Sequence, residues 1–276
     1  MKKESFRVKL QHEGKKLFIV ISDHLKISKK KAQALIDDKR ILVNGKRIWI
    51  RNHLLNEDDK IEILFYPKSI VSKKNLSILW QDDNYIIVNK SSGVITNSNS
   101  KSLEKMLQEK LHNPNIIAVH RLDKETSGCI LFAMTLNAKK AAIPMFRENK
   151  IIKVYRALTI GKFPNSWREI RTDIDGYIAT TIVKILDSNR QSSYLELRIE
   201  TGRTHQIRRH LANKRHPVLG DKKYAGTGNE ISLSQPRHML HAYRLIFPHP
   251  ITQKTIRVTA PLPVDFKKAL HQLKLN

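Results

Sequence analysis

A single carboxylate in a polar loop is the part of this sequence best suited to chemistry. Asp123 lies in the stretch 119–128, VHRLDKETSG, between two apolar runs at 115–119 and 129–133 that we predict as short strands. Binding and catalysis concentrate on loops that rigid strands hold in place. The alternative is a structural turn in which Asp123 bonds the backbone and Gly128 supplies an unusual dihedral angle. The loop alone leaves both interpretations open.

The elements around this loop predict a large α+β domain. Helices are expected at 102–112 and 137–150, one on each side of the loop. Alternation of apolar and polar residues predicts half-buried strands, which we place at 78–81, 85–89, 153–160, 178–186, 194–200, 241–247 and 255–258. This pattern favours a large, mixed but mostly antiparallel sheet.

A smaller unit of mixed elements precedes that domain. Extended segments are expected at 6–10 and 16–21, followed by a helix at 29–38 that Ser28 can cap. Asn44-Gly45 joins two short apolar runs, which is one of the strongest signals for a tight β-hairpin.

We therefore predict a small domain at 1–66, a linker at 67–76 and a larger domain at 77–276. The linker is polar and begins with a proline.

The charge of the chain indicates a polyanionic partner. Lys and Arg outnumber Asp and Glu by 51 to 25, which gives a formal net charge of +26. Such an excess is typical of proteins that bind nucleic acid. An anionic membrane explains it less well, because no helical pattern combines a long apolar face with a basic one. A generally basic surface without such a partner is the alternative.

Several kinds of site are disfavoured by composition. Cys129 is the only cysteine, so an internal disulfide and a thiolate metal cluster are excluded, which fits a reducing cytoplasm. No apolar run approaches the roughly 20 residues that span a bilayer, and no signal core follows the N-terminus. The histidines lack the spacing of metal ligands, and the glycines form no phosphate-binding loop. We expect neither a metal nor a cofactor.

Four stretches of the larger domain occur together and in a fixed order. They are HRLDKETSG at 120–128, KVYRA at 153–157, GRTHQIRRHL at 202–211 with PVLGDKKY at 217–224, and RHMLHA at 237–242. This ordered set resembles the RluA-type pseudouridine synthases, from about Ser77 to the end of the chain. The first 66 residues resemble a small S-four-like RNA-binding domain, which commonly precedes that catalytic domain.

The resemblance implies that the chain isomerises uridines in RNA. The bond from nitrogen 1 of uracil to the ribose is broken, the base turns, and carbon 5 is joined instead, without a cofactor. The expected substrate is ribosomal RNA of the large subunit, either free or in an assembling subunit, and DNA is not expected. Lys29, Lys30 and Lys46 of the small domain are candidate RNA contacts.

The resemblance also assigns roles to residues of the larger domain. Asp123 acts on the nucleotide as a nucleophile or as a base. Arg121 is the candidate wedge that fills the space left by the flipped base, with a phosphate contact as its alternative. Tyr155 stacks on the uracil, because a phenol with a pKa near 10 is a poor base.

An ionised carboxylate in a pocket that excludes water needs a paired cation. The resemblance implies that Arg208 is this partner, because it best matches the basic residue that pairs with the aspartate in the family; it lies on a helix that Thr204 can cap. Arg203 and Arg209 are alternatives for the pairing or for phosphate binding.

Three other functions stay open at this point. The first is the same chemistry on transfer RNA. The second is a non-catalytic RNA-binding or ribosome-assembly factor, which would not require Asp123, Tyr155 and Arg208 together. The third is a metal-dependent nuclease.

Overall fold

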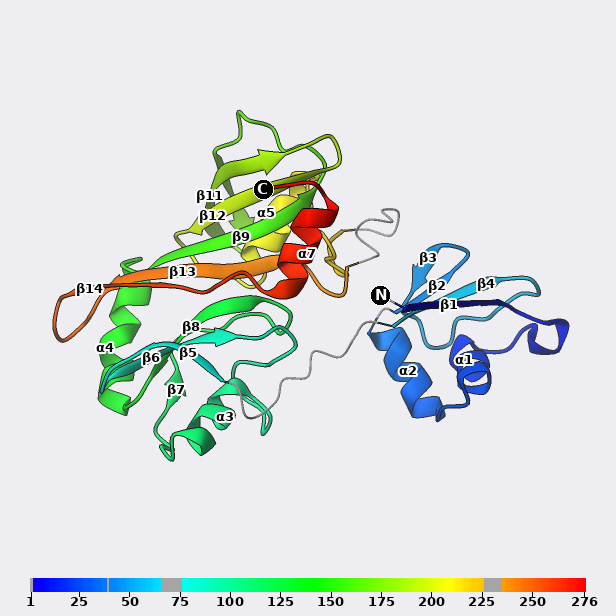
Figure 1. Cartoon of the computed structure of the whole chain (residues 1–276), viewed down its shortest axis with the longest axis horizontal. Helices are drawn as coiled ribbons and strands as arrows, with labels where there is room; N and C mark the ends of the chain where they lie inside the picture. The colour runs from blue at the N-terminus through cyan, green and yellow to red at the C-terminus, as the bar shows by residue number, and fades with distance from the viewer. Residues whose placement is uncertain (1, 39, 66–75, 226–234) are drawn as a thin grey trace. The chain divides into compact units, whose positions relative to one another are not determined.

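The structure is a computed structural model that describes residues 2–38, 40–65, 76–225 and 235–276. Contacts between Cα atoms divide the chain into two compact units. The smaller unit contains the described residues up to Phe65, drawn in dark to light blue in Figure 1, and residues 235–236; the larger contains residues 76–225 and 237–276. Residues 67–75 of the predicted linker lie outside the described residues, so the domain boundaries stay a prediction.

The smaller unit is a four-stranded antiparallel sheet with two helices. Its elements are β1 (Lys2–Arg7), a short 3₁₀ turn (Leu10–His12), α1 (Leu17–Leu25), α2 (Lys29–Asp37), β2 (Ile41–Val43), β3 (Lys46–Ile48) and β4 (Lys60–Phe65), with strand order β1-β4-β2-β3. Ala32 and Ile36 of α2 share one apolar cluster with Ile61 and Ile63 of β4. The helices therefore cover one face of this sheet.

Local signals predicted α2 and the β2–β3 hairpin of this unit, whereas the extended segment expected at 6–10 overlaps only the end of β1 and runs into the 3₁₀ turn. Ser28 accepts a hydrogen bond from the Lys31 amide, which confirms it as the cap of α2. Asn44 and Gly45 both have positive φ, 50° and 76°, as a two-residue type I′ hairpin requires. The extended segment predicted at 16–21 is wrong, because this stretch begins α1.

The error in α1 has a physical cause. Its sequence LFIVISDHL is rich in β-branched residues, which favour strands when read alone. Leu17, Val20 and Ile21 are nevertheless all completely buried, at the three- and four-residue spacing of a helix face. Packing against the sheet overrides the local preference.

The larger unit is built on a ten-stranded sheet, shown in Figure 1. Its strands are β5 (Ser77–Gln81), β6 (Tyr85–Lys90), β7 (Ile117–Ala118), β8 (Ser127–Ala133), β9 (Ile152–Ile160), β10 (Glu169–Ile174), β11 (Tyr177–Ser188), β12 (Ser192–Ile199), β13 (Leu240–Pro248) and β14 (Thr255–Thr259). The main order is β10-β11-β12-β9-β13-β8-β6-β5, and β14 and β7 pair with β13 and β8. The β13–β8 pair is parallel and the other pairs are antiparallel, so the predicted α+β class is confirmed.

Helices cover both faces of the sheet. They are α3 (Leu103–Lys110), α4 (Leu136–Arg147), α5 (Gln206–Asn213) and α7 (Val264–Gln272). Alternate residues of β8 face opposite sides: Ile130 packs in the cluster that contains residues of α3 and α5, and Leu131 packs with α4. The helix α7 and the strand β10 were not predicted from the sequence. No helix in the described part of the chain has the length and apolar character needed to cross a membrane.

One glycine allows the central strands to meet. Ala242 of β13 lies beside Gly128 of β8 in the parallel pair. Gly128 has φ +113°, and a Cβ atom built on it would lie 2.1 Å from the Ala242 carbonyl oxygen. Only glycine fits both the dihedral angle and the close backbone approach. This contact lies five residues after Asp123, where the loop enters the sheet.

Candidate active site

The Asp123 loop is attached to the end of β6 by a buried lysine. Lys90, which is 1% exposed, donates from Nζ to the carbonyl oxygens of Lys124 (3.0 Å), Val94 (2.8 Å) and Ser91 (3.2 Å). Three acceptors match the three protons of an ammonium group. Burial, and secondarily the charge of Arg237, lowers the pKa of Lys90 to about 7. The lysine thus fixes the backbone immediately after Asp123.

The other end of the loop is held by the segment that leads into β13. The Thr126 hydroxyl lies 2.8 Å from Nε2 of His238, and the Ser127 hydroxyl lies 2.9 Å from Nδ1 of His241. Arg237 donates to the Ser127 hydroxyl (3.3 Å) and to the carbonyl oxygen of Glu125 (3.2 Å). Both ends of the loop are therefore anchored through buried side chains, which leaves Asp123 at a defined position.

A buried arginine links Asp123 to a second carboxylate. Arg208 donates from Nη1 to Oδ2 of Asp123 (2.8 Å) and from Nε and Nη2 to Asp221 (2.6 and 3.0 Å). The Asp221 side chain is fully buried, whereas that of Asp123 is 26% exposed. Burial disfavours the charged form of Arg208, but the hydrogen bonds that it donates to Asp221 and to Asp123 hold its pKa above the ordinary value. The site can thus present one ionised, partly accessible carboxylate.

The helix that carries Arg208 does not begin as predicted. Its N-cap is His205 rather than Thr204, and no side-chain capping bond is formed there. Gln206 closes the preceding turn instead, because its Oε1 accepts from the Arg203 amide (3.1 Å) and from the Thr201 hydroxyl (2.7 Å). A side chain inside the helix therefore replaces the expected cap.

Tyr155 lies on β9 and lines one cleft together with Asp123 and Arg208. It is 7% exposed and packs in the core cluster that contains Leu122 and Ile207. Burial, with a smaller effect of Asp123, raises the pKa of the Tyr155 phenol well above its ordinary value. A phenol that keeps its proton is suited to stacking on a base and unsuited to abstracting a proton.

The cleft brings together five of the residues singled out from the sequence: Arg121, Asp123, Tyr155, Arg203 and Arg208. Arg121 is exposed at its edge. The guanidinium of Arg203 lies 4.2 Å from the ring centroid of Tyr177, at the start of β11.

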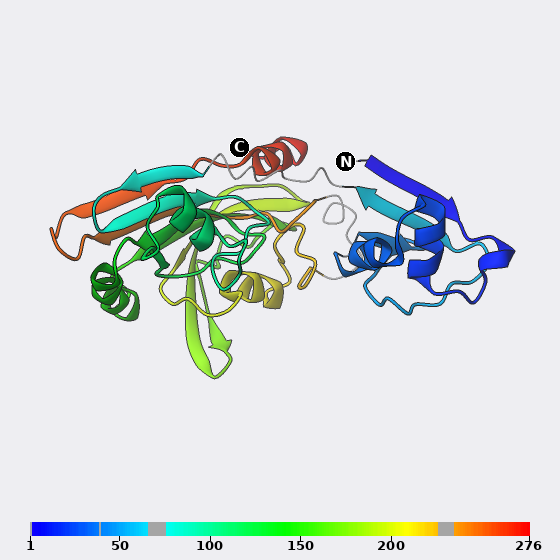
Figure 2. The ribbon, with the colours of Figure 1, turned by 90° about the horizontal axis from the view of Figure 1, so that it is seen from below.

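Arg209 points elsewhere. It donates to both carboxylate oxygens of Asp175 (2.9 Å each), in the turn between β10 and β11. Figure 2 shows α5 beside this projecting hairpin. Of the two alternatives to Arg208, Arg203 therefore stacks on the β10–β11 hairpin and Arg209 forms an ion pair with the same hairpin.

Lys29, Lys30 and Lys46 belong to the smaller unit. Lys29 and Lys30 occupy the first turn of α2, and Lys46 is the first residue of β3 after the hairpin turn. All three side chains are exposed.

Three contacts of the site were not assigned from the sequence. Asp221 and Tyr224 belong to the PVLGDKKY stretch, and His205 belongs to GRTHQIRRHL. The available signal was the need of a buried arginine for more than one acceptor, which should have directed attention to a second carboxylate. Among the described residues, no group of three or more His, Cys, Asp or Glu is arranged to hold a metal ion.

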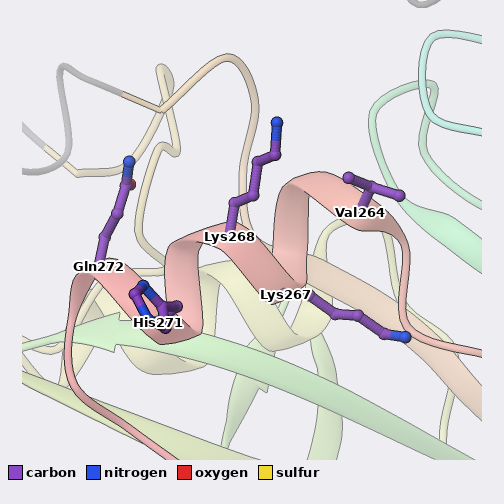
Figure 3. Close-up of a pocket in the computed structure, with 5 residues that line it drawn as sticks. All are labelled: Val264, Lys267, Lys268, His271 and Gln272. Carbon is purple, nitrogen blue, oxygen red and sulfur yellow. The ribbon is translucent and has the colours of Figure 1, made fainter.

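A second hollow lies on a different element. Figure 3 shows its five lining residues, Val264, Lys267, Lys268, His271 and Gln272, which project from α7 alone. It shares no residue with the Asp123 cleft.

The chain is similar to known RNA-modifying proteins. Residues 84–213, which include Asp123, Tyr155 and Arg208, match the family described as RNA pseudouridylate synthase. The chain is 30% identical to the uncharacterized RNA pseudouridine synthase YhcT of Bacillus subtilis, over 93% of each protein. It is 29% identical to the ribosomal large subunit pseudouridine synthase D of Neisseria meningitidis, over 98% of this chain and 81% of that protein.

Solved structures show the same fold. Human RNA pseudouridylate synthase domain containing 4 superposes with a TM-score of 0.61 at 25% identity, over 72% of this chain and 94% of that one. Human RNA pseudouridylate synthase domain containing 1 gives the same score and identity, over 77% and 98%.

Proposed function

Since this chain belongs to the RNA pseudouridine synthase family, we propose that it converts uridines of large-subunit ribosomal RNA to pseudouridine with Asp123 as the catalytic carboxylate. The observation that carries the role of Asp123 is its pairing with Arg208 in a cleft that also contains Tyr155. A non-catalytic RNA-binding protein would have no need for an ionised carboxylate held in this way.

The reaction balances without a further reactant. The bond between nitrogen 1 and the ribose breaks, the bond between carbon 5 and the ribose forms, and one proton moves from carbon 5 to nitrogen 1. Asp123 has one oxygen bonded to Arg208 and a side chain that is 26% exposed toward the cleft. It can serve as the nucleophile or as the base in this exchange.

The uridine must leave its stack before Asp123 can reach it. Unstacking costs a few kcal/mol, and a side chain that fills the vacated space offsets part of that cost. Arg121 is exposed at the edge of the cleft, two residues before Asp123. It acts as the wedge, while the neutral phenol ring of Tyr155 holds the flipped base by stacking.

The smaller unit supplies electrostatic attachment to the RNA. Two helices on a four-stranded sheet and a type I′ hairpin support its assignment as an S-four-like domain of residues 1–66. Lys29, Lys30 and Lys46 are exposed and reach phosphates from the start of α2 and from the hairpin. The 51 Lys and Arg residues of the chain favour this mode of binding, which salt should weaken.

The substrate proposal rests on relatives whose names specify the ribosomal large subunit. It is tested by mapping pseudouridine in total RNA from cells with and without this protein, and from cells that carry only the Asp123→Asn variant. Sites in large-subunit ribosomal RNA that vanish in both altered strains are expected. If the lost sites lie only in transfer RNA, the substrate is transfer RNA rather than ribosomal RNA. An unchanged map would contradict the proposed function.

If large-subunit sites vanish, adding the purified protein to naked ribosomal RNA and to assembling particles then shows which of the two is the substrate.

A further inference from the structure

The two oxygens of the Asp123 carboxylate face different side chains. Oδ2 accepts from Arg208 at 2.8 Å, whereas Oδ1 lies 3.6 Å from Nε2 of His205. The second separation is longer than a hydrogen bond. Such contacts in a free enzyme often tighten when substrate fills the site. His205 lines the cleft, and its side chain is 23% exposed.

The two groups come from one turn of chain. His205 is the N-cap of α5 and Arg208 lies three residues later, so both project from the same side of the helix start. His205 has φ +56°, in the left-handed region that residues other than glycine and asparagine rarely adopt. Its side chain makes no capping bond to α5 that would explain this conformation.

A tyrosine sets the orientation of the imidazole. The Tyr224 hydroxyl lies 3.0 Å from Nδ1 of His205, and the two rings meet edge to face with centroids 5.8 Å apart. The Tyr224 amide donates to Oδ1 of Asp221 (3.1 Å), the carboxylate that also binds Arg208. The tyrosine is therefore fixed by the same group that fixes the arginine.

The hydrogen-bonding capacity of these partners selects one tautomer. A carboxylate only accepts, so Nε2 must carry the proton that faces Asp123. Nδ1 is then the acceptor, and the Tyr224 hydroxyl is its donor. This arrangement is the same kind of tautomer control that an orienting group exerts in other catalytic sites.

The charges around His205 favour its neutral form. Burial lowers its pKa; Arg208 and Lys223 act in the same direction, and Asp123 and Asp221 oppose them. A neutral imidazole adds a donor to Oδ1 without adding a second positive charge next to Arg208. The carboxylate can then be oriented at both oxygens and keep its negative charge.

We propose that His205 is a positioning residue for Asp123: its Nε2–H closes onto Oδ1 when RNA fills the cleft, and Tyr224 maintains the tautomer that makes this possible. The inference rests on the proposed function, because it assigns a supporting group to the same carboxylate. It predicts that loss of the imidazole slows the chemical step and leaves RNA affinity nearly unchanged.

The decisive variant is His205→Gly. Glycine adopts φ +56° without strain, so the variant should be at least as stable as the parent protein. His112→Gly is the matched control, since His112 also has positive φ (49°) and is exposed, outside the residues that line the cleft. We expect the single-turnover rate of His205→Gly to fall by about 10- to 100-fold, and that of His112→Gly to match the parent rate.

Two further readouts separate positioning from a structural role. Added imidazole should restore part of the rate of His205→Gly and have no effect on the parent protein or on His112→Gly. Tyr224→Phe, which removes only the hydroxyl, should show a smaller loss of rate and no rescue by imidazole.

The outcomes are distinguishable. A parent protein that forms no pseudouridine would overturn the proposed function itself. An active parent and a His205→Gly variant of equal rate would overturn the role of His205. A slow His205→Gly variant whose rate added imidazole does not restore would overturn positioning and leave only a structural contribution.

Discussion

Replacing Arg208 by methionine should destabilise the larger unit, because Asp221 loses its cation. It should also abolish activity, because Asp123 loses the same cation. Arg208 is the bidentate partner of Asp221, whose side chain is fully buried. Removing one member of a buried ion pair leaves an uncompensated charge, at a cost of about 3–5 kcal/mol. In a unit of this size that loss lowers the melting temperature by roughly 6–20 °C.

A second substitution separates stability from activity. Asp221→Asn removes the stranded charge but keeps an oxygen for the amides of Lys223 and Tyr224, which Oδ1 now accepts at 2.9 and 3.1 Å. The double variant Arg208→Met/Asp221→Asn should therefore regain most of the lost stability. It should stay inactive, because Asp123 still lacks its cation.

Urea unfolding measures stability, and release of tritium from carbon 5 of uridine in a single turnover measures chemistry. An Arg208→Met variant as stable as the parent protein would show that Asp221 does not depend on this cation. A double variant that forms product at the parent rate would show that Arg208 has no role at Asp123.

Three further predictions follow from the buried residues around the site. Tyr155→Phe should retain most of the single-turnover rate and Tyr155→Ala should lose it, and equal losses would contradict stacking. The pKa of His241 is lowered to about 4, chiefly by burial. The unfolded chain therefore binds a proton that the folded protein does not, and the free energy of unfolding should fall by about 3 kcal/mol as pH drops from about 6.5 to about 4. In urea titrations, a His241→Gln variant should lack this part of the fall in the free energy of unfolding. If the free energy of unfolding of the variant and of the parent protein depended on pH in the same way, the prediction would be contradicted. Gly128→Ala should lower the free energy of unfolding by about 3 kcal/mol or more because of the 2.1 Å clash with the Ala242 carbonyl oxygen. The control Gly176→Ala, at φ +83° and with no atom within 4 Å, should lower it by only about 1 kcal/mol in the same assay.

Features that depend on a few neighbouring residues were predictable from the sequence. Asn44-Gly45 specifies its turn by the dihedral angles that both residues tolerate. Ser28 specifies the start of α2 by a bond to an amide three residues away. The extended segment predicted at 16–21 was wrong because the helix α1 forms through packing against the sheet rather than through local preference.

The site depends on contacts that no local pattern encodes. Arg208 and Asp123 are 85 residues apart, and they meet only because the sheet and α5 bring them together. The ordered motifs could assign Arg208 by resemblance, but periodicity alone could not choose it over Arg203 or Arg209. A buried arginine needs more than one acceptor, which indicates a second carboxylate, but no local pattern shows that this carboxylate is Asp221.

The Asp123→Asn variant tests whether Asp123 carries out the chemistry. Asparagine keeps the size of the side chain and one acceptor for Arg208 but removes the negative charge. The measurement is pseudouridine formed in a single turnover on large-subunit ribosomal RNA, with RNA affinity measured on the same preparation. We expect parental affinity with no product above background; product formation at the parental rate would show that Asp123 is not the catalytic carboxylate.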